Sequence, residues 1–541
     1  MTRPVKARPV NPWAALTALC IGFFMILLDT TIVTIAVPTM VRGLNTSLNS
    51  VVWVISIYLL VYAVPMLFTS RLGDRFGPKR VFLAGMVVFT AASLWCGLSG
   101  TAGMLIAARA VQGLGAALMT PQTLAFITHL FPPAKRGPAM GMWGGIAGLA
   151  TITGPLLGGV LVDSLGWEWI FFVNVPIGVV GLVLTVFLVP DWQPGRLRSF
   201  DFPGIVLSVA ALGLLVFGIQ NGQHYGWGTV AGWLTIPEFI GAGVVLMVVF
   251  VVWQRYNRGE PLVPLRVFGN RNFSTGTVTA TAIGFAMTGM FVPLVLYTQN
   301  VLGLSPTRAG LLTAPMSLLS GLIAPFIGRL SDRANAKYLV MVGFLALAGG
   351  LGLIALQARP DTNPWSLVPA LLLAGVGTGC VFAPMSNITM RAVEPALAGT
   401  ASGIFNTSRQ VGGVLGSAAI GVLLQARISA SMATEAADAA RSLPPEYRGA
   451  FVEGLAQAAS SANELNGRVG TDVPSSLPSD VADQIHRLAQ QVVHNGLTDA
   501  TRESMILPVA VLLIGALAAT LMRRVPAPEP PRTREPASQQ A

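Results

Sequence analysis

Long apolar stretches recur along the whole chain, each of about 18–25 residues. They begin near residues 14, 50, 80, 102, 139, 170, 203, 234, 273, 306, 338, 365, 397 and 504. A helix of this length spans a bilayer, because about 20 residues at 1.5 Å each cover its apolar core of about 30 Å. Only 11% of the 541 residues are charged, against about a quarter in soluble domains. We predict an all-α membrane protein with 14 transmembrane helices.

The basic residues orient this chain in the membrane. Of 34 Lys and Arg, 23 fall in alternate connections and termini and nine on the opposite side, while Arg109 and Arg409 lie inside apolar stretches. Cytoplasmic loops carry such an excess, so we expect both termini in the cytoplasm. The net charge of +11 then needs no nucleic acid partner. The first apolar stretch continues to about Pro38, which is too long for a signal peptide.

A basic loop with a central aspartate occurs twice, at residues 70–80 and 328–337. Each copy follows one membrane-length stretch and precedes another, which indicates a duplicated architecture. We therefore predict a six-helix half over 1–190, a two-helix insert with its linker over 191–271, a second six-helix half over 272–522 and a disordered cytoplasmic tail over 523–541. Parallel repeats of this kind bind substrate between the halves near the midplane. We expect the paired loops to lock helix ends together as a gate, through Asp74, Arg75, Lys79, Arg80, Asp332 and Arg333.

One connection is far longer than the others, over about residues 425–503 on the outer side. Two parts of it have helical periodicity, around Phe451 and around Leu488. The sequence leaves two alternatives, a folded cap over the exit and a mobile surface loop.

Asp29 is the one acidic residue deep inside an apolar stretch. A buried carboxylate is costly in a membrane and is functional by default. Arg109 lies at a similar distance from the same membrane face, so a direct or water-bridged link is expected, in which Arg109 favours proton release from Asp29. The alternatives are a structural carboxylate bonded to neighbouring side chains and an arginine that extends toward the membrane surface.

Other residues inside the apolar stretches are candidates for a hinge or for the substrate cavity. The run from Gly154 to Gly159 combines a proline with small residues, which allows a bend or close helix packing. Aromatic rings can stack on an aromatic or cationic substrate, although each can equally be a packing residue. The hinge candidates are Gly154, Pro155, Gly158 and Gly159, and the cavity candidates are Gln112, Tyr58, Tyr62, Trp143, Tyr297, Asn406 and Arg409.

Motifs of soluble enzymes do not occur in the sequence: it has no phosphate-binding loop, no nucleophile elbow and no metal-ligand spacing. The protein is predicted not to be an enzyme and to need no cofactor. Uphill transport without a nucleotide motif would take its energy from a proton gradient.

These motifs together resemble the major facilitator superfamily, in particular its fourteen-helix drug:proton antiporters of the EmrB/QacA type. The similarity lies in residues 28–38, the loop 70–80, Arg109 to Gly113, Gly154-Pro155, residues 167–178 and Asn406 to Gln410. By this resemblance Asp29 would recognise protons or cations, Arg109 would relay protons, Asp74 would belong to the cytoplasmic gate and Gly154-Pro155 would form the hinge. Ser70 and Pro78 depart from the family pattern and weaken the charge cluster of that gate.

The sequence therefore predicts a monomeric, proton-coupled multidrug efflux transporter in the bacterial cytoplasmic membrane. Because one carboxylate compensates one cation, the expected substrates are amphipathic drugs or metabolites that are monocationic or neutral. Two alternatives remain, a dedicated exporter of an endogenous metabolite or lipid and a sensor that binds ligand without transport.

Overall fold

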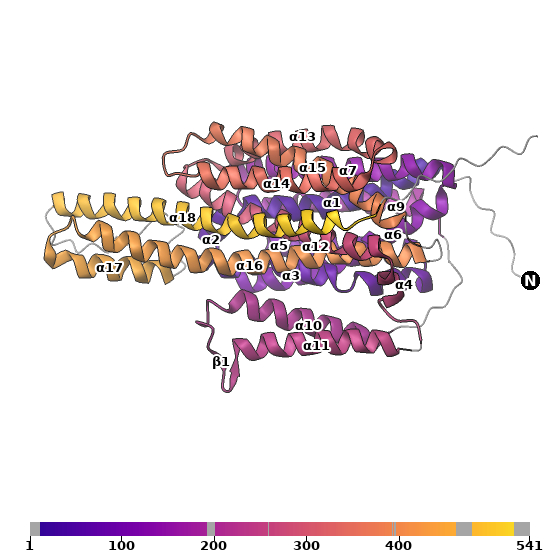
Figure 1. Ribbon diagram of the computed structural model, residues 1–541, viewed down its shortest axis with the longest axis horizontal. Coiled ribbons are helices and arrows are strands. Elements are labelled where there is room, and N and C mark those ends of the chain that lie inside the picture. Colours follow the sequence, from indigo (N-terminus) through magenta and orange to yellow (C-terminus); the bar gives the residue numbers. More distant parts are fainter. Residues whose placement is uncertain are drawn as a thin grey trace, which may run out of the picture.

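The protein is a bundle of long helices that run along one common axis (Figure 1). This computed structural model describes residues 11–191, 201–257, 259–391, 393, 397–460 and 479–523. The helices in this part of the chain are α1 (Pro12–Ile35), α2 (Val37–Gly43), α3 (Leu48–Ala63), α4 (Met66–Phe76), α5 (Pro78–Gly97), α6 (Ala102–Leu130), α7 (Pro133–Leu165), α8 (Trp169–Phe172), α9 (Asn174–Leu188), α10 (Phe202–Asn221), α11 (Ile236–Tyr256), α12 (Arg271–Leu296), α13 (Pro306–Arg333), α14 (Ala336–Gln357), α15 (Val368–Met390), α16 (Ala398–Ala440), α17 (Pro445–Ser460) and α18 (Ser479–Thr520).

Short elements connect some of these helices. The strands β1 (Thr229–Ala231) and β2 (Leu234–Thr235) form an antiparallel hairpin between α10 and α11. The single turns η1 (Leu265–Gly269), η2 (Tyr297–Val301) and η3 (Pro364–Leu367) adjoin α12 and α15. The part of the chain outside the described ranges includes residues 524–541, so the predicted tail is not tested.

Twelve helices in the described residues are long and apolar enough to cross a membrane. Two shorter apolar helices, Leu48–Ala63 and Thr153–Leu165, accompany them. The predicted all-α membrane class is therefore confirmed. Several helices begin where the sequence supplies a cap, because an uncapped helix leaves its first N–H groups without acceptors. The side chains of Asn11, Ser47 and Thr101 each accept a hydrogen bond from a backbone N–H in the first turn.

The two ends of the bundle differ. At one end α16 and α18 project beyond the other helices and, with α17, form an extension that we call the stalk, over the described residues of 425–503 (Figure 1). The opposite end carries residues 70–80, and we call it the loop end. The hairpin of β1 and β2 lies toward the stalk end.

The stalk is a packed helical structure in its described part. Its helices share a buried apolar core formed by Met432, Ala436, Leu443, Phe451, Leu455, Val492 and Leu497. Polar contacts join the two long helices as well, since Arg427 and Glu503 form an ion pair at 2.9 Å and Asn495 donates to Glu435 at 2.8 Å. The sequence left open whether residues 425–503 are folded or form a mobile surface loop, and their described part is folded. The loop boundary expected at residue 425 was wrong, because α16 continues as a helix to Ala440.

The pair α10 and α11 lies at one side of the bundle, where α10 contacts α3 and α16 (Figure 1). Toward the stalk end, Asn221 accepts hydrogen bonds from Asn49 at 3.0 Å and from Trp53 at 3.2 Å. At the loop end, Asp201 accepts from Trp253 and Gln254 of α11, at 2.8 and 2.7 Å. The contacts of Asn221 attach the pair to α3 toward the stalk end, whereas those of Asp201 join α10 to α11 at the loop end.

Candidate functional site

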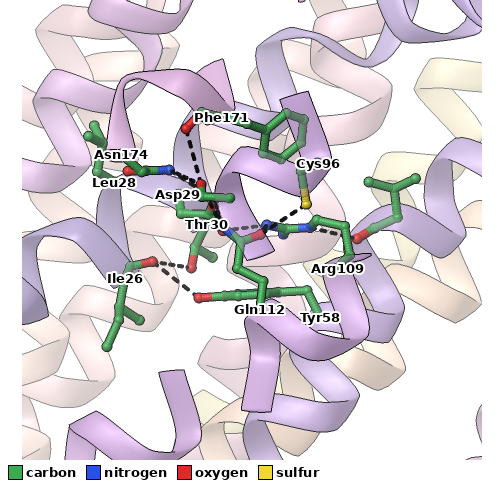
Figure 2. Close-up of polar contacts among 12 residues, drawn as sticks. Ile26, Leu28, Asp29, Thr30, Tyr58, Cys96, Arg109, Gln112, Phe171 and Asn174 are labelled. Carbon is green, nitrogen blue, oxygen red and sulfur yellow. Dashed lines mark hydrogen bonds and ion pairs between the residues drawn. The ribbon is translucent and has the colours of Figure 1, made fainter. Parts of the chain in front are cut away.

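A buried ion pair lies inside the bundle between α1 and α6 (Figure 2). Arg109 Nη1 is 2.5 Å from Asp29 Oδ2, and the side chains of Arg109 and Asp29 are 1% and 0% exposed. The two residues expected at similar depth are thus in direct contact. Arg109 does not extend to the surface, which removes the alternative of an arginine anchored at the membrane edge.

Neutral amide groups complete the surroundings of the carboxylate (Figure 2). Gln112 Nε2 donates to Asp29 Oδ1 at 2.9 Å, and Asn174 Nδ2 donates to the same atom at 3.4 Å. Gln112 Oε1 in turn accepts from Arg109 Nη1 at 2.6 Å. Ser93 Oγ accepts from both amides, at 3.1 and 3.2 Å. Because unpaired charge is costly in a low-dielectric interior, these donors and the guanidinium offset part of the cost of burying an ionised carboxylate at Asp29.

Arg109 also connects this cluster to α3. Its Nε donates to the backbone carbonyl of Val54 at 3.1 Å, and its guanidinium lies 4.0 Å from the ring centroid of Tyr58. Phe171 covers a further side, with its ring centroid 5.7 Å away. The cation is therefore surrounded by a carboxylate of α1, a carbonyl and an aromatic ring of α3, and a second aromatic ring of α8. A change in the charge of Asp29 would be felt directly by α3.

The glycine run of α7 packs against α1 beside this cluster. A Cβ at Gly158 would lie 2.6 Å from Ile32 Cγ1, and one at Gly154 would overlap Thr31. On the other side of α7, a Cβ at Gly159 would lie 2.6 Å from the carbonyl oxygen of Pro306 in α13. The hinge candidates thus form a close-packed seam that begins two residues after Asp29. A side chain at Gly159 would require the backbone of α13 to move, whereas one at Gly154 or Gly158 would first displace the side chain of Thr31 or Ile32.

Two further contacts join the helices α1–α9 to the helices α12–α18 toward the stalk end. Ser56 of α3 and Ser417 of α16 are hydrogen-bonded at 2.8 Å. Gln299 of η2 donates to the backbone carbonyl of Ile35 at 2.9 Å. The bundle is therefore closed between these two helix groups at that end.

Arg409 and Tyr62 lie on opposite sides of the contact between α16 and α3. The charge of Arg409 interacts with Tyr62, whose hydroxyl is hydrogen-bonded to Thr120 at 3.0 Å. The rings of Tyr62 and Tyr58 are 5.9 Å apart. Asn406, one turn before Arg409, donates to the backbone carbonyl of Ser402 at 3.0 Å.

The other aromatic candidates lie elsewhere. Trp143 stacks on Phe23, with ring centroids 4.3 Å apart. Tyr297 lies in η2, where its hydroxyl donates to the backbone carbonyl of Arg359 at 2.7 Å. Both side chains contact other residues of the helix bundle, which favours the alternative that Tyr297 and Trp143 are packing residues and not part of a substrate cavity.

The loop end shows a different set of contacts from the one expected. Lys79 donates to the backbone carbonyl of Val186 at 2.8 Å, and Arg80 is paired with Asp191 at 3.4 Å. These two cations were expected beside Asp74, which was wrong, because their contacts are with the end of α9. Arg71 is 8% exposed and donates to the carbonyls of Glu260 and Pro261, at 3.1 and 2.6 Å. The side chains of Asp332 and Arg333 lie outside the described part of the structure.

Sequence reasoning did not select Ser93, Asn174 and Arg71. Ser93 and Asn174 are isolated polar residues in apolar stretches, and both are completely buried. That signal was available, but many such residues only bond their own helix, so it does not single out these two. The role of Arg71 depends on the linker at residues 260–261, which is distant in sequence.

The described residues contain no group of three or more His, Cys, Asp or Glu that could hold a metal ion. Ionisable side chains inside a membrane bundle often mark a substrate or ion pathway, so the buried pair of Asp29 and Arg109 fits a transporter. This class agrees with the model of the Major Facilitator Superfamily, which matches residues 19–417. The chain belongs to that superfamily.

The curated relatives are membrane transporters. An uncharacterized MFS-type transporter of Mycobacterium tuberculosis is 49% identical over 422 residues, which are 78% of this chain and 72% of the relative. The tetracenomycin C resistance and export protein of Streptomyces glaucescens is 36% identical, over 79% of this chain and 78% of its own. The multidrug resistance protein Stp of M. tuberculosis is 34% identical, over 77% and 76%. The protein is therefore a multi-pass membrane transporter.

Solved structures show the same fold. A bacterial homolog of the human lysosomal transporter Spinster, in an inward-facing and occupied conformation, aligns with a TM-score of 0.60 at 18% identity. The alignment covers 95% of this chain and 97% of that one. A D-xylose-proton symporter aligns with a TM-score of 0.54 at 14% identity, over 76% of this chain and 90% of its own.

Proposed function

We propose that this protein is a proton-driven exporter of amphipathic small molecules that works by alternating access. The observation that carries the proposal is the fully buried pair of Asp29 and Arg109, the first of which can bind and release a proton. Relatives named as multidrug resistance and antibiotic export proteins support the direction of transport. One proton moved down a gradient of one pH unit supplies about 1.4 kcal/mol, which sustains a substrate ratio of about ten.

The contacts of Arg109 suggest how protonation drives the conformational change. When Asp29 is protonated, Arg109 loses its counterion, and its attraction to the carboxylate falls. Arg109 is bonded to the carbonyl of Val54 in α3, and α3 reaches α16 through Ser56 and Ser417. Movement of Arg109 would therefore be transmitted through α3 to the contacts that close the bundle near the stalk end. Asp29 would take up a proton from the outer side and release it on the inner side.

We place the loop end in the cytoplasm, following the distribution of basic residues. Counting the twelve long helices with the two shorter apolar ones gives fourteen spans. In this layout the halves are residues 1–190 and 272–522, and residues 191–271 hold the inserted pair α10 and α11. The gate at the loop end would include Asp74 and Arg75. We propose that the protein is a monomer in the bacterial cytoplasmic membrane and that, with the stalk end closed, this conformation is the inward-facing one.

Thiol labelling tests this topology, since the three native cysteines are buried. A cysteine at Ser442 on the stalk should react with an impermeant maleimide added to intact cells. A cysteine at Ala334, at the loop end, should react only after the cells are opened. The reverse pattern would contradict the orientation.

Efflux from proteoliposomes tests the proposed function. Wild-type protein should concentrate a neutral fluorescent amphiphile when a pH gradient is applied, and Asp29→Asn should not. Asp438→Asn is a matched control, because Asp438 is an exposed stalk carboxylate paired with Arg441 at 3.0 Å. Uphill transport by Asp29→Asn at the wild-type rate would show that the proton site is elsewhere.

A dedicated exporter of one endogenous metabolite is a second candidate. Relatives named for single compounds favour it, among them the tetracenomycin C export protein and a probable actinorhodin transporter of Streptomyces coelicolor. A compound panel in the same liposomes separates the two, because a dedicated exporter would move one chemical series.

A further inference from the structure

The charges inside the membrane-spanning helices do not cancel. The sequence has three ionisable side chains deep in these helices that carry full charge at neutral pH, Asp29, Arg109 and Arg409. Asp29 and Arg109 neutralise each other in a contact of 2.5 Å. The positive charge of Arg409 remains, on α16 and at the contact with α3.

The guanidinium of Arg409 has no bonded partner among the described residues. Among the residues that the structure describes, none forms an ion pair or accepts a hydrogen bond from this side chain. Its electrostatic neighbour is the hydroxyl-bearing ring of Tyr62. Nearby on α16, Thr407 Oγ1 is buried without a hydrogen-bond partner. Arginine has five N–H donors, so this region of the bundle has an excess of unused donors.

Such a cation is expensive to keep in a membrane protein. An arginine at the centre of a bilayer is rare and, where it occurs, faces a partner or a water-filled cavity. Arg409 is half-buried rather than fully enclosed. The backbone carbonyl of Arg409 packs closely against Gly284 of α12.

The site lies where a transported molecule would pass. Arg409 is on α16 and Tyr62 is on α3, and these two helices hold the contact of Ser56 with Ser417 that closes the stalk end. A Cβ at Gly413, one turn after Arg409, would lie 3.8 Å from Leu59 of α3. The guanidinium and the aromatic ring therefore flank the region between the two helix groups, on the loop-end side of the closure.

We propose that Arg409 binds an anionic group, a carboxylate or a phenolate, of the transported amphiphile. This assignment rests on the proposed export function and makes its substrate class more specific. A planar guanidinium matches a carboxylate with two parallel hydrogen bonds. Asp29 is engaged by Arg109 and is not available to compensate a cationic substrate. The preferred substrates are therefore monoanionic or neutral, and not monocationic as the sequence predicted.

Equilibrium binding to the full-length protein in nanodiscs tests this assignment. The probes are three fluorescent congeners with one ring system: 7-diethylaminocoumarin-3-carboxylate, its neutral methylamide and its cationic trimethylammonioethyl amide. Fluorescence anisotropy gives a Kd for each. Wild-type protein should bind the anion about ten-fold or more tightly than the cation. Arg409→Gln should weaken binding of the anion by about ten-fold and change that of the neutral amide by less than about two-fold.

Two control variants accompany the test. Arg409→Lys keeps the charge and should retain most of the preference for the anion. Arg308→Gln removes an arginine from an exposed position at the start of α13 and should bind all three probes as the wild type does. Binding of the neutral amide shows that Arg409→Gln is folded.

Three results would overturn the assignment. They are unchanged binding of the anion by Arg409→Gln, equal loss of all three probes in that variant, and a wild-type preference for the cation. Because binding needs no gradient, this outcome is independent of proton coupling. A protein that binds the anion through Arg409 but shows no pH-driven efflux would contradict the proposed function and leave this assignment in place.

Discussion

Arg109 and Arg409 are two arginines of one helix bundle whose surroundings differ. Both lie inside membrane-spanning helices, on α6 and on α16. Arg109 is completely enclosed and is satisfied by a carboxylate, an amide and a carbonyl. Arg409 is half-buried, and the described residues supply no acceptor for it. The first arginine is therefore part of the protein's own structure, whereas the second needs a partner from outside.

This difference separates two tasks that a transporter must couple. The enclosed pair can change its charge without contact with substrate, because protonation of Asp29 changes only its bonds to Arg109 and the amides. The lone guanidinium can bind substrate without a proton of its own. Tyr58 and Tyr62, with rings 5.9 Å apart, lie between the two sites. Coupling then depends on α3, which contacts both arginines.

The largest effect is expected when the carboxylate of the enclosed ion pair is removed. Asp29→Asn should abolish accumulation of a neutral substrate, since no proton can be exchanged, while downhill exchange continues. With one pH unit the wild type should hold a ratio of about ten and the variant a ratio of one. Accumulation is measured by fluorescence in proteoliposomes. A ratio above one in the variant would mean that another group carries the proton.

Thermal unfolding compares the two arginines directly. Removal of one member of a buried ion pair costs about 3–5 kcal/mol, because the other charge stays buried without a partner. Arg109→Gln should therefore lower the melting temperature strongly, and the double variant with Asp29→Asn should recover part of the loss. Arg409→Gln removes a charge that has no partner and should leave stability unchanged or raised. Equal destabilisation by both glutamine variants would remove the distinction between the two arginines.

A steric change near the enclosed pair should have a moderate effect. Gly158→Val would press on Ile32, three residues after Asp29, and overpacking of this kind costs about 1–3 kcal/mol. The expected result is slower efflux with unchanged binding of the anionic probe at Arg409. Gly145→Val is the matched control, because a Cβ at Gly145 of α7 would meet nothing within 4 Å. Similar efflux by both variants would show that the α1–α7 seam does not affect the proton site.

The smallest effect concerns a carboxylate outside the membrane-spanning helices. Burial alone would raise the pKa of Asp201, but hydrogen bonds from Trp253, Gln254 and the backbone N–H groups of Leu262 and Gly204 lower it overall. A lowered pKa in the folded protein stabilises it at neutral pH, and this contribution is lost as the pH falls through the folded pKa. Asp201→Ala should thus unfold more easily than the wild type at pH 7.

The difference between the two proteins should shrink at acid pH, below the ordinary aspartate pKa of about 3.9. Thermal melts at several pH values give this measurement. A difference that is constant with pH would mean that the side chain of Asp201 acts by packing alone. Unlike Asp29, this carboxylate is held by neutral donors, so no arginine is left without a partner when it is removed.

Much of the fold could be predicted because apolar length and basic residues act locally. The stretches that begin near residues 14, 80 and 203 correspond to α1, α5 and α10. The helical content of the stalk was underestimated from the sequence. Its helices carry charged residues on one side and pack their apolar sides against each other. A search for membrane-length apolar runs does not detect such helices, although the repeat of Phe451 and Leu455 indicated one of them.

The charged residues of the site could be predicted from the sequence, but the residues that form hydrogen bonds with them could not. The cost of burying a carboxylate singles out Asp29 from sequence alone, and equal depth suggested Arg109. That Asn174 bonds this carboxylate depends on how α9 packs against α1, which no local pattern encodes. The same holds for Lys79, whose contact with the carbonyl of Val186 depends on where α9 ends.

Substrate-induced proton release tests the central claim most directly. The neutral coumarin amide is added to purified protein in weakly buffered solution, and a pH-sensitive dye records the protons released. The wild type should release up to about one proton for each substrate bound, at a pH between the pKa of the site in the free protein and that in the substrate-bound protein. Arg409→Gln should release protons as the wild type does with this neutral probe, and Asp29→Asn should release none. Undiminished proton release by Asp29→Asn would contradict the account, because the proton would then come from a group other than the buried pair.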